Sequence, residues 1–198
     1  MPQSLNAMRR FGAAKATKYK PYSEGDRSLA TTVTPAADMI VESLNSNGFI
    51  YLCGNGGSAA DAQHIAGEFV GRFKLSRQAL PAIALSTNTS VLTCIGNDYN
   101  FENIFERQLE AFIKQNDILW VLSTSGLSTN IINAAKVARK KMAKIIAFIG
   151  KSGSELENIA DLCIYVNSSV ASSIQEIHQI AYHIICDLVE SKILKKVK

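Results

Sequence analysis

Short, continuous apolar runs alternate along this chain with longer stretches whose apolar residues recur at helical spacing. The short runs are rich in isoleucine, leucine and valine, and polar or small residues bound them, as is typical of strands buried on both faces. We therefore expect five strands, at residues 49–53, 82–85, 118–122, 145–149 and 163–166.

The helical stretches lie before, between and after these strands. Thr34-Pro35 is typical of an N-cap followed by proline at the first helical position, and it predicts a helix that begins there and covers residues 36–46. Further helices are expected at 59–73, 101–113, 130–142, 155–160 and, as a long final helix, 173–194. This alternation favours an α/β fold with a doubly wound, mostly parallel five-stranded sheet flanked by helices.

The first part of the chain lacks this regular pattern. Residues 1–33 are polar, weakly periodic and interrupted by Gly12, Pro21 and Gly25. We expect residues 1–33 to form an N-terminal arm and residues 34–198 to form one domain, a division that suits a chain of 198 residues.

Composition excludes several classes of protein. A hydrophobic content of 47% with a net charge of +4 is that of a globular chain, and no apolar run reaches the roughly 18 residues of a membrane span. Basic residues gather at the two ends, which is typical of solvated tails, so we expect neither a nucleic-acid nor a membrane partner. The cysteines lie inside apolar segments without a CxxC pair, which predicts buried, reduced thiols in a cytoplasmic protein; they are Cys53, Cys94, Cys163 and Cys186.

Two loops that follow predicted strands carry candidate chemistry. The first, residues 53–58, is glycine-rich and precedes a helix, whose N-terminal N–H groups can bind an anion. The second, residues 123–130, adds several hydroxyl groups to the same arrangement, which suits a phosphate monoester. The alternative for each loop is a plain turn with a helix cap, but two such loops in one small domain favour a binding site.

The first loop also fits the GxGxxA pattern of dinucleotide-binding proteins. That function requires an acidic residue about 20 residues further on, at the end of the second strand. Here residues 85–88 are Leu-Ser-Thr-Asn. The glycines therefore suit a sugar phosphate better than a dinucleotide.

The histidines restrict where imidazole chemistry can occur, because the chain has only three. Asp61, His64 and Glu68 share one helix face, and a His–Glu pair at this spacing can bind a metal, act as a base with its partner, or be a surface pair without function. On the final helix His178 and His183 lie about 140° apart, so both cannot face one site. Spacing alone leaves open which of them is functional.

Taken in order, these residues resemble the phosphoheptose isomerase family, the sedoheptulose 7-phosphate isomerases of the sugar isomerase (SIS) fold. The resemblance runs from about Gly48 to the C-terminus. It implies a SIS-type, flavodoxin-like fold. The matching segments are residues 54–64 with Glu68, residues 96–99, residues 123–126 with Ser128, and residues 174–178 with His183.

The resemblance implies conversion of D-sedoheptulose 7-phosphate to D-glycero-D-manno-heptose 7-phosphate, for ADP-heptose and surface-glycan biosynthesis. It implies that Glu68 is the catalytic base and His183 the second acid–base group. One zinc ion per subunit would be bound by His64, Glu68, Gln175 and His183. Substrate would be bound, besides Glu68, by Ser123, Thr124, Ser125 and Ser128 at the phosphate and by Asn55, Gly56, Gly57, Asn97, Asp98 and Gln175 along the sugar.

The family is tetrameric, so the resemblance also implies a homotetramer with sites between subunits. A different class remains as an alternative, because some SIS proteins bind a sugar phosphate, or a protein partner such as a replication initiator, without catalysis. This chain has both Glu68 and His183, which favours the enzyme.

Overall fold

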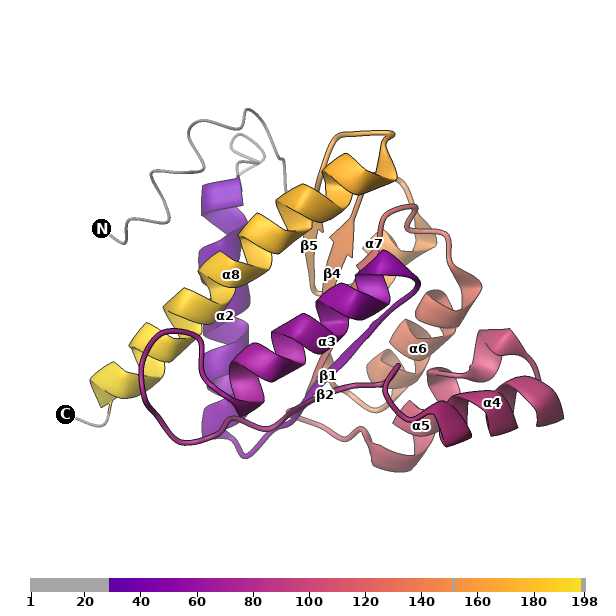
Figure 1. Ribbon diagram of the computed structural model, residues 1–198, viewed down its shortest axis with the longest axis horizontal. Helices are drawn as coiled ribbons and strands as arrows, with labels where there is room; N and C mark the ends of the chain where they lie inside the picture. Colours follow the sequence, from indigo (N-terminus) through magenta and orange to yellow (C-terminus); the bar gives the residue numbers. More distant parts are fainter. Residues whose placement is uncertain (1–28, 151, 197–198) are drawn as a thin grey trace.

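The computed structural model describes residues 29–150 and 152–196, and it contains a five-stranded parallel sheet with helices on both faces (Figure 1). Its spatial order, β2-β1-β3-β4-β5, is that of a flavodoxin-like doubly wound sheet. The prediction of fold class is confirmed, and each predicted strand is correct to within one residue at either end. The strands are β1 (Ile50–Gly54), β2 (Ala82–Ala84), β3 (Ile118–Ser123), β4 (Lys144–Ile149) and β5 (Leu162–Tyr165).

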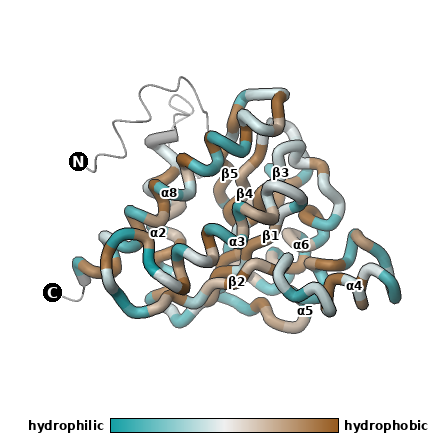
Figure 2. The backbone as a smooth tube through the Cα atoms, in the orientation of Figure 1, coloured by the Kyte–Doolittle hydropathy of each residue, from teal (hydrophilic) through white to brown (hydrophobic). Residues whose placement is uncertain are grey.

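The strands contain few polar residues because both faces of the sheet are covered. Every residue of β1 and β3 is buried. Leu52 pairs with Trp120 and Cys53 with Val121, and alternation along the strands sends these two pairs to opposite faces. Figure 2 shows the hydrophobic segments gathered along the strands and a hydrophilic loop between α3 and β2.

Two groups of helices cover the sheet. On one face lie α2 (Leu29–Asn45), α3 (Gly57–Val70) and α8 (Ala171–Lys196), packed on the core that contains Trp120. On the other face lie η1 (Phe101–Asn103), α5 (Glu106–Phe112), α6 (Thr129–Lys140) and α7 (Glu155–Ile159), with α4 (Thr89–Asp98) at their edge. Within the described part of the chain, no helix combines the length and apolar character that crossing a bilayer requires.

The predicted start of the first helix is wrong. Helix α2 begins at Leu29, and Pro35 lies inside it rather than at its first position. Val33, Ala36 and Ile40 are fully buried on both sides of the proline. Packing of this apolar stripe therefore offsets the backbone hydrogen bond that proline cannot donate.

The division between arm and domain stays a prediction. The expected boundary after residue 33 falls inside α2, while residues 1–28 lie outside the described part of the chain.

The helix predicted over residues 101–113 is two separate elements, η1 and α5, and helix α4 was not predicted. Asparagine side chains start both unexpected elements: Asn88 accepts the N–H of Val91 at 3.1 Å, and Asn100 accepts that of Glu102 at 2.9 Å. Ile95 is the one buried residue of α4, and Val91 and Leu92 are partly buried beside it, so the apolar face of this helix is short.

The position of α4 also corrects one expectation about the cysteines. Cys53, Cys163 and Cys186 are buried as predicted, but Cys94 is exposed. It lies on α4, where Ile95 is the buried residue and its neighbours face solvent.

His178 is fully buried on α8, with its ring 5.2 Å from that of Phe148. Neither ring nitrogen forms a well-aligned hydrogen bond among the described residues, and the nearby backbone of Ile149 opposes the effect of burial only in part. Burial therefore lowers the pKa of His178 to about 4.

We predict that His178 reduces stability in acid. Its pKa is about 4 in the folded chain and about 6.5 in an unfolded one. Between these values only the unfolded state binds the proton, so the free energy of unfolding falls as the pH falls through this window, by roughly 3 kcal/mol in total. Urea denaturation at about pH 7 and about pH 4.5 should show a smaller decrease for His178→Phe than for the unaltered protein. Equal decreases of the free energy of unfolding in the two proteins would contradict the low pKa of His178, because all other titratable groups are common to both.

Candidate active site

The loops that follow β1 and β3 lie next to each other at the carboxyl edge of the sheet. The helix after β1 covers one face and the helix after β3 covers the other, which is the position at which doubly wound sheets commonly bind their ligands. The side-chain amides of Asn55 and Asn130 join the two loops, each donating to the other's oxygen at 2.9 Å. This reciprocal pair sets the distance between the two loops.

Two neighbouring glycines shape the loop after β1. Gly56 has a φ of +54°, a conformation that residues with a side chain rarely adopt. At Gly57 a Cβ atom would lie 2.4 Å from Nε2 of Gln175, so this glycine lets α8 approach the loop closely. The predicted sugar-binding residues Gly56, Gly57 and Gln175 are thus neighbours.

The loop after β3 collects hydroxyl groups around a turn. The Ser123 hydroxyl accepts the N–H of Gly126 at 3.2 Å and lies 3.4 Å from the hydroxyl of Ser128. The Ser125 hydroxyl accepts the N–H of Leu127 at 3.1 Å. Ser128 is the N-cap residue of α6, yet its side chain makes no capping hydrogen bond. Hydroxyls and helix N–H groups at this point suit a phosphate group.

Helices α3 and α8 lie side by side and run in the same direction (Figure 1). Gln175 contacts Gly57, and seven residues further along each helix come Tyr182 and His64. Because both helices rise about 1.5 Å per residue, this common offset places the two side chains at the same level. Segments far apart in the sequence therefore meet.

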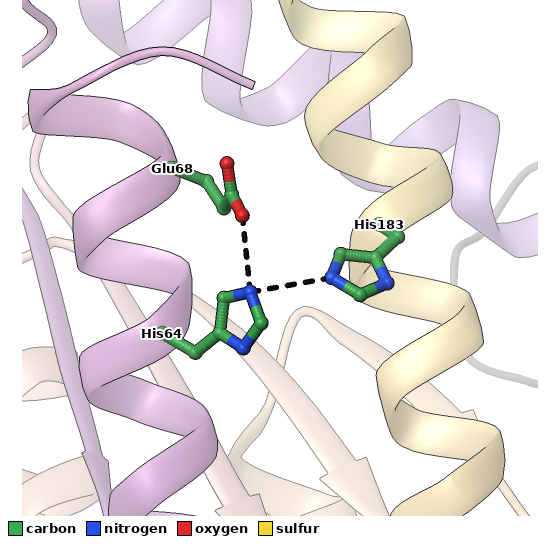
Figure 3. A group of neighbouring side chains, drawn as sticks. All are labelled: His64, Glu68 and His183. Carbon is green, nitrogen blue, oxygen red and sulfur yellow. Dashed lines mark hydrogen bonds and ion pairs between the residues drawn. The ribbon is translucent and has the colours of Figure 1, made fainter. Parts of the chain in front are cut away.

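His64, Glu68 and His183 form a cluster between these helices (Figure 3). Nε2 of His64 lies 3.0 Å from Oε1 of Glu68 and 3.4 Å from Nε2 of His183. The side chain of His64 is 43% exposed and that of Glu68 19%, so a small molecule can reach the cluster from solvent. The structure also decides between the two histidines of α8, because His178 is buried on another face of the helix.

Burial affects the charges around the cluster. It lowers the pKa of His183, and the nearby His64 lowers it further, so the His183 ring favours its neutral form. Burial also raises the pKa of Asp61, against the opposing effect of a hydrogen bond from Tyr182. A neutral His183 imidazole near the Glu68 carboxylate can accept and return protons.

The loop after α3 is held in place by residues that the sequence analysis missed. The buried carboxylate of Glu190 accepts the N–H groups of Phe73, Lys74 and Leu75. The Phe73 ring in turn stacks on His183, with centroids 5.6 Å apart and planes at 22°. Glu190 comes seven residues after His183, on the same helix face, which is the one signal that could have indicated it.

Arg77 ties this loop to the end of α3. Its guanidinium donates to the carbonyl groups of Glu68 and Phe69, at 2.6 and 2.9 Å, and its Nε lies 4.0 Å from the Glu190 carboxylate. These hydrogen bonds hold the backbone carbonyl groups at the end of α3, including that of Glu68, in place.

Two predicted sugar contacts lie elsewhere in the chain. Asn97 and Asp98 end α4, where the Asn97 amide donates to the Asp98 carboxylate at 2.9 Å. Figure 1 shows α4 on the opposite side of the molecule from α8. One copy of the chain does not bring these two residues to the cluster.

The donor atoms of the cluster fit a zinc ion. Two imidazole nitrogens and a carboxylate oxygen are the ligand set of some catalytic zinc sites, and bonds of about 2.0–2.1 Å in a tetrahedron separate ligands by about 3.3 Å. The three side chains offer atoms that all lie within 4.8 Å of one another. Gln175, the fourth expected ligand, lies against Gly57 and comes eight residues before His183, about 12 Å along the helix axis.

Known proteins share both this sequence and this fold. Residues 22–150 match the SIS domain family. A phosphoheptose isomerase from Clostridium acetobutylicum is 51% identical over 85% of this chain and 86% of its own, and one from Synechocystis is 46% identical over 85% and 87%. The structure of a phosphoheptose isomerase from Neisseria gonorrhoeae superposes with a TM-score of 0.78 at 39% identity, covering 82% of this chain and 87% of the other. The chain therefore belongs to the phosphoheptose isomerase family of SIS-domain proteins.

Proposed function

We propose that this chain is a ketose–aldose isomerase that interconverts D-sedoheptulose 7-phosphate and D-glycero-D-manno-heptose 7-phosphate. The observation that carries the proposal is the meeting of Glu68 and His183 beside His64, in a chain of the phosphoheptose isomerase family. A carboxylate and a neutral imidazole on one side of a sugar are the groups that such an isomerisation requires.

We propose that the two loops orient the sugar phosphate. Its phosphate group binds the hydroxyls and N–H groups of the loop after β3, and its carbon chain extends along Gly57 and Gln175. Seven residues of α3, or about 10 Å of helix rise, separate Gly57 from His64. That span is on the scale of an extended seven-carbon sugar phosphate, so the opposite end of the sugar reaches the cluster.

The reaction moves one hydrogen between carbons and one between oxygens. Glu68 removes a proton from C1 of the ketose and returns it to C2, while His183 takes the proton of the O1 hydroxyl and delivers it to O2. The bond order shifts from C2=O2 to C1=O1 through an enediolate, and atoms and charge balance. The lowered pKa of His183 favours a neutral ring, which can accept the first proton while its lone pair is not occupied by a metal ion.

We propose that His64, Glu68 and His183 hold a zinc ion. Gln175, which the family resemblance implies as a fourth ligand, packs against Gly57 in this structure and is not part of the cluster. When bound, zinc supplies a Lewis acid that stabilises negative charge on the enediolate oxygens. Figure 3 shows the second carboxylate oxygen of Glu68 directed away from both histidines. One oxygen of Glu68 can therefore serve the metal while the other faces the substrate.

We further propose that a second copy of the chain contributes Asn97 and Asp98 in a homotetramer. These residues lie far from the cluster of their own chain, and they carry large exposed apolar neighbours. Tyr99 is 56% and Phe101 63% exposed. Apolar side chains exposed beside polar ones are typical of a surface that another subunit covers.

Replacing either acid–base group should abolish most turnover. Glu68→Gln and His183→Gln keep the shape of the side chains but remove the proton-transferring group, so kcat should fall by about 10²–10⁴. A coupled assay with sedoheptulose 7-phosphate measures the loss, and circular dichroism checks that the variants are folded. The matched control is Glu155→Gln, which should keep full activity. Glu155 of α7 is exposed and forms an ion pair with Lys136 of α6.

Full activity in either variant would refute the assigned roles. Absence of turnover by the unaltered protein, with and without added zinc, would favour the non-catalytic alternative, a SIS protein that binds a sugar phosphate or a protein partner.

Zinc binding should depend on the cluster and not on other imidazoles. Equilibrium dialysis should find one zinc ion per chain in the unaltered protein. His64→Gln removes one of the ligands of the cluster and should weaken binding by about 10-fold or more, on the order of the loss seen when a metal site is disturbed. His178→Phe removes a histidine of α8 that lies outside the cluster, so its zinc affinity should be unchanged. Equal affinities in all three proteins would contradict the proposed site.

A further inference from the structure

Asn130 belongs to two parts of the candidate site at once. It is the second residue of α6, directly after the loop that follows β3. The first N–H groups of a helix have no partner within the helix, so the backbone N–H of Asn130 is among those available to the phosphate group. Its side chain is buried and reaches the loop after β1, where it meets Asn55.

The two side-chain amides fix each other in one orientation. Nδ2 of each residue donates to Oδ1 of the other, and both distances are 2.9 Å. Rotating either amide by half a turn would place nitrogen against nitrogen and oxygen against oxygen, and both hydrogen bonds would be lost together. The orientation of the Asn55 amide is therefore set by Asn130.

The backbone of the sheet does not supply this constraint. The parallel pairing between β1 and β3 ends at Gly54 and Leu122, one residue before Asn55. The next residue, Gly56, has a φ of +54°, so the chain turns away from the strand direction at this point. The amide pair thus continues the connection between the two segments beyond the end of the ladder.

The pair leaves part of the Asn55 amide free. A primary amide has two N–H donors and an oxygen with two lone pairs, and the pair uses one donor and one lone pair. Asn55 is partly exposed whereas Asn130 is buried, so the remaining donor and acceptor of Asn55 are the ones that a ligand can reach. A sugar hydroxyl both donates and accepts, so it can use both groups.

We propose that Asn130 is a positioning residue that acts through Asn55, by fixing the orientation in which Asn55 offers one N–H and one lone pair to a hydroxyl of the sugar chain. The inference rests on the proposed function, which supplies the sugar phosphate as the ligand. Because Asn130 also lies beside the phosphate loop, the pair holds the sugar contact at a fixed distance from the phosphate.

Binding of two ligands distinguishes this role from a general effect on the fold. In Asn130→Ala the affinity for sedoheptulose 7-phosphate, measured by phosphorus NMR titration, should fall by about 10-fold, the scale of one or two lost hydrogen bonds. The affinity for inorganic phosphate should be unchanged, because alanine keeps the backbone N–H. Equal losses for the two ligands would contradict the proposal, since a loosened phosphate loop weakens both.

The matched control is Asn133→Ala. Asn133 has the same side chain three residues further along α6, and its amide contacts the Glu102 carbonyl at 3.4 Å, away from Asn55. This variant should bind both ligands as the unaltered protein does.

A double-variant comparison tests whether Asn130 acts through Asn55. Once Asn55 is alanine, Asn130→Ala should weaken binding of the sugar phosphate by less than about 2-fold further. Equal losses in the two backgrounds would show that Asn130 acts independently and would overturn the proposal.

The amide pair can also be observed in the unaltered protein, without any dependence on how well a variant folds. NMR of the side-chain amides, with Asn55→Ala to assign the signal, should show slower hydrogen exchange for Asn55 than for Asn133. Equally fast exchange would refute the pair. Failure of the unaltered protein to bind sedoheptulose 7-phosphate would refute the proposed function and with it the role of Asn130, whereas normal binding by Asn130→Ala would refute the role of Asn130 alone.

Discussion

The close contact between α3 and α8 is the constraint on which the site depends. Gly57 has no side chain, so Gln175 packs directly on its backbone, and a Cβ at this position would collide with the glutamine amide. With the two parallel helices in register at this point, equal numbers of residues bring His64 level with Tyr182 and His183. A shift of one residue between the helices would rotate the facing side chains by about 100° and separate the cluster.

The charged groups behind the cluster stabilise a loop rather than the sheet. Glu190 binds three consecutive backbone N–H groups after α3, and Arg77 binds the last carbonyls of that helix, including that of Glu68. Both side chains are almost completely buried, which makes their partners obligatory, because an unpaired buried charge is destabilising by several kcal/mol. The loop consequently presents Phe73 to the His183 ring in a fixed position.

Apolar patterning predicted the five strands to within a residue because strands covered on both faces exclude polar side chains. Prediction from apolar patterning failed where a helix buries few side chains, and where packing compensates for a proline inside a helix. Helix α4 buries Ile95 and only partly covers Val91 and Leu92, so its apolar face is short. Helix α2 continues through Pro35 because its apolar stripe is packed against the core. The pairing of Asp61, His64 and Glu68 on one face followed from spacing, whereas the choice of His183 over His178 did not.

By itself the sequence determined the α/β class, the two candidate loops after β1 and β3 and, through the order of its motifs, the family. These depend on local patterns: the runs of buried residues, the glycines after β1 and the hydroxyls after β3. Only the tertiary structure decided which histidine of α8 meets His64, that Tyr182 lies between them, and that Glu190 holds the loop beside them. The physical reason is that these contacts join α3 to residues more than a hundred positions away, and their geometry is set by the register of two packed helices, which no local spacing encodes.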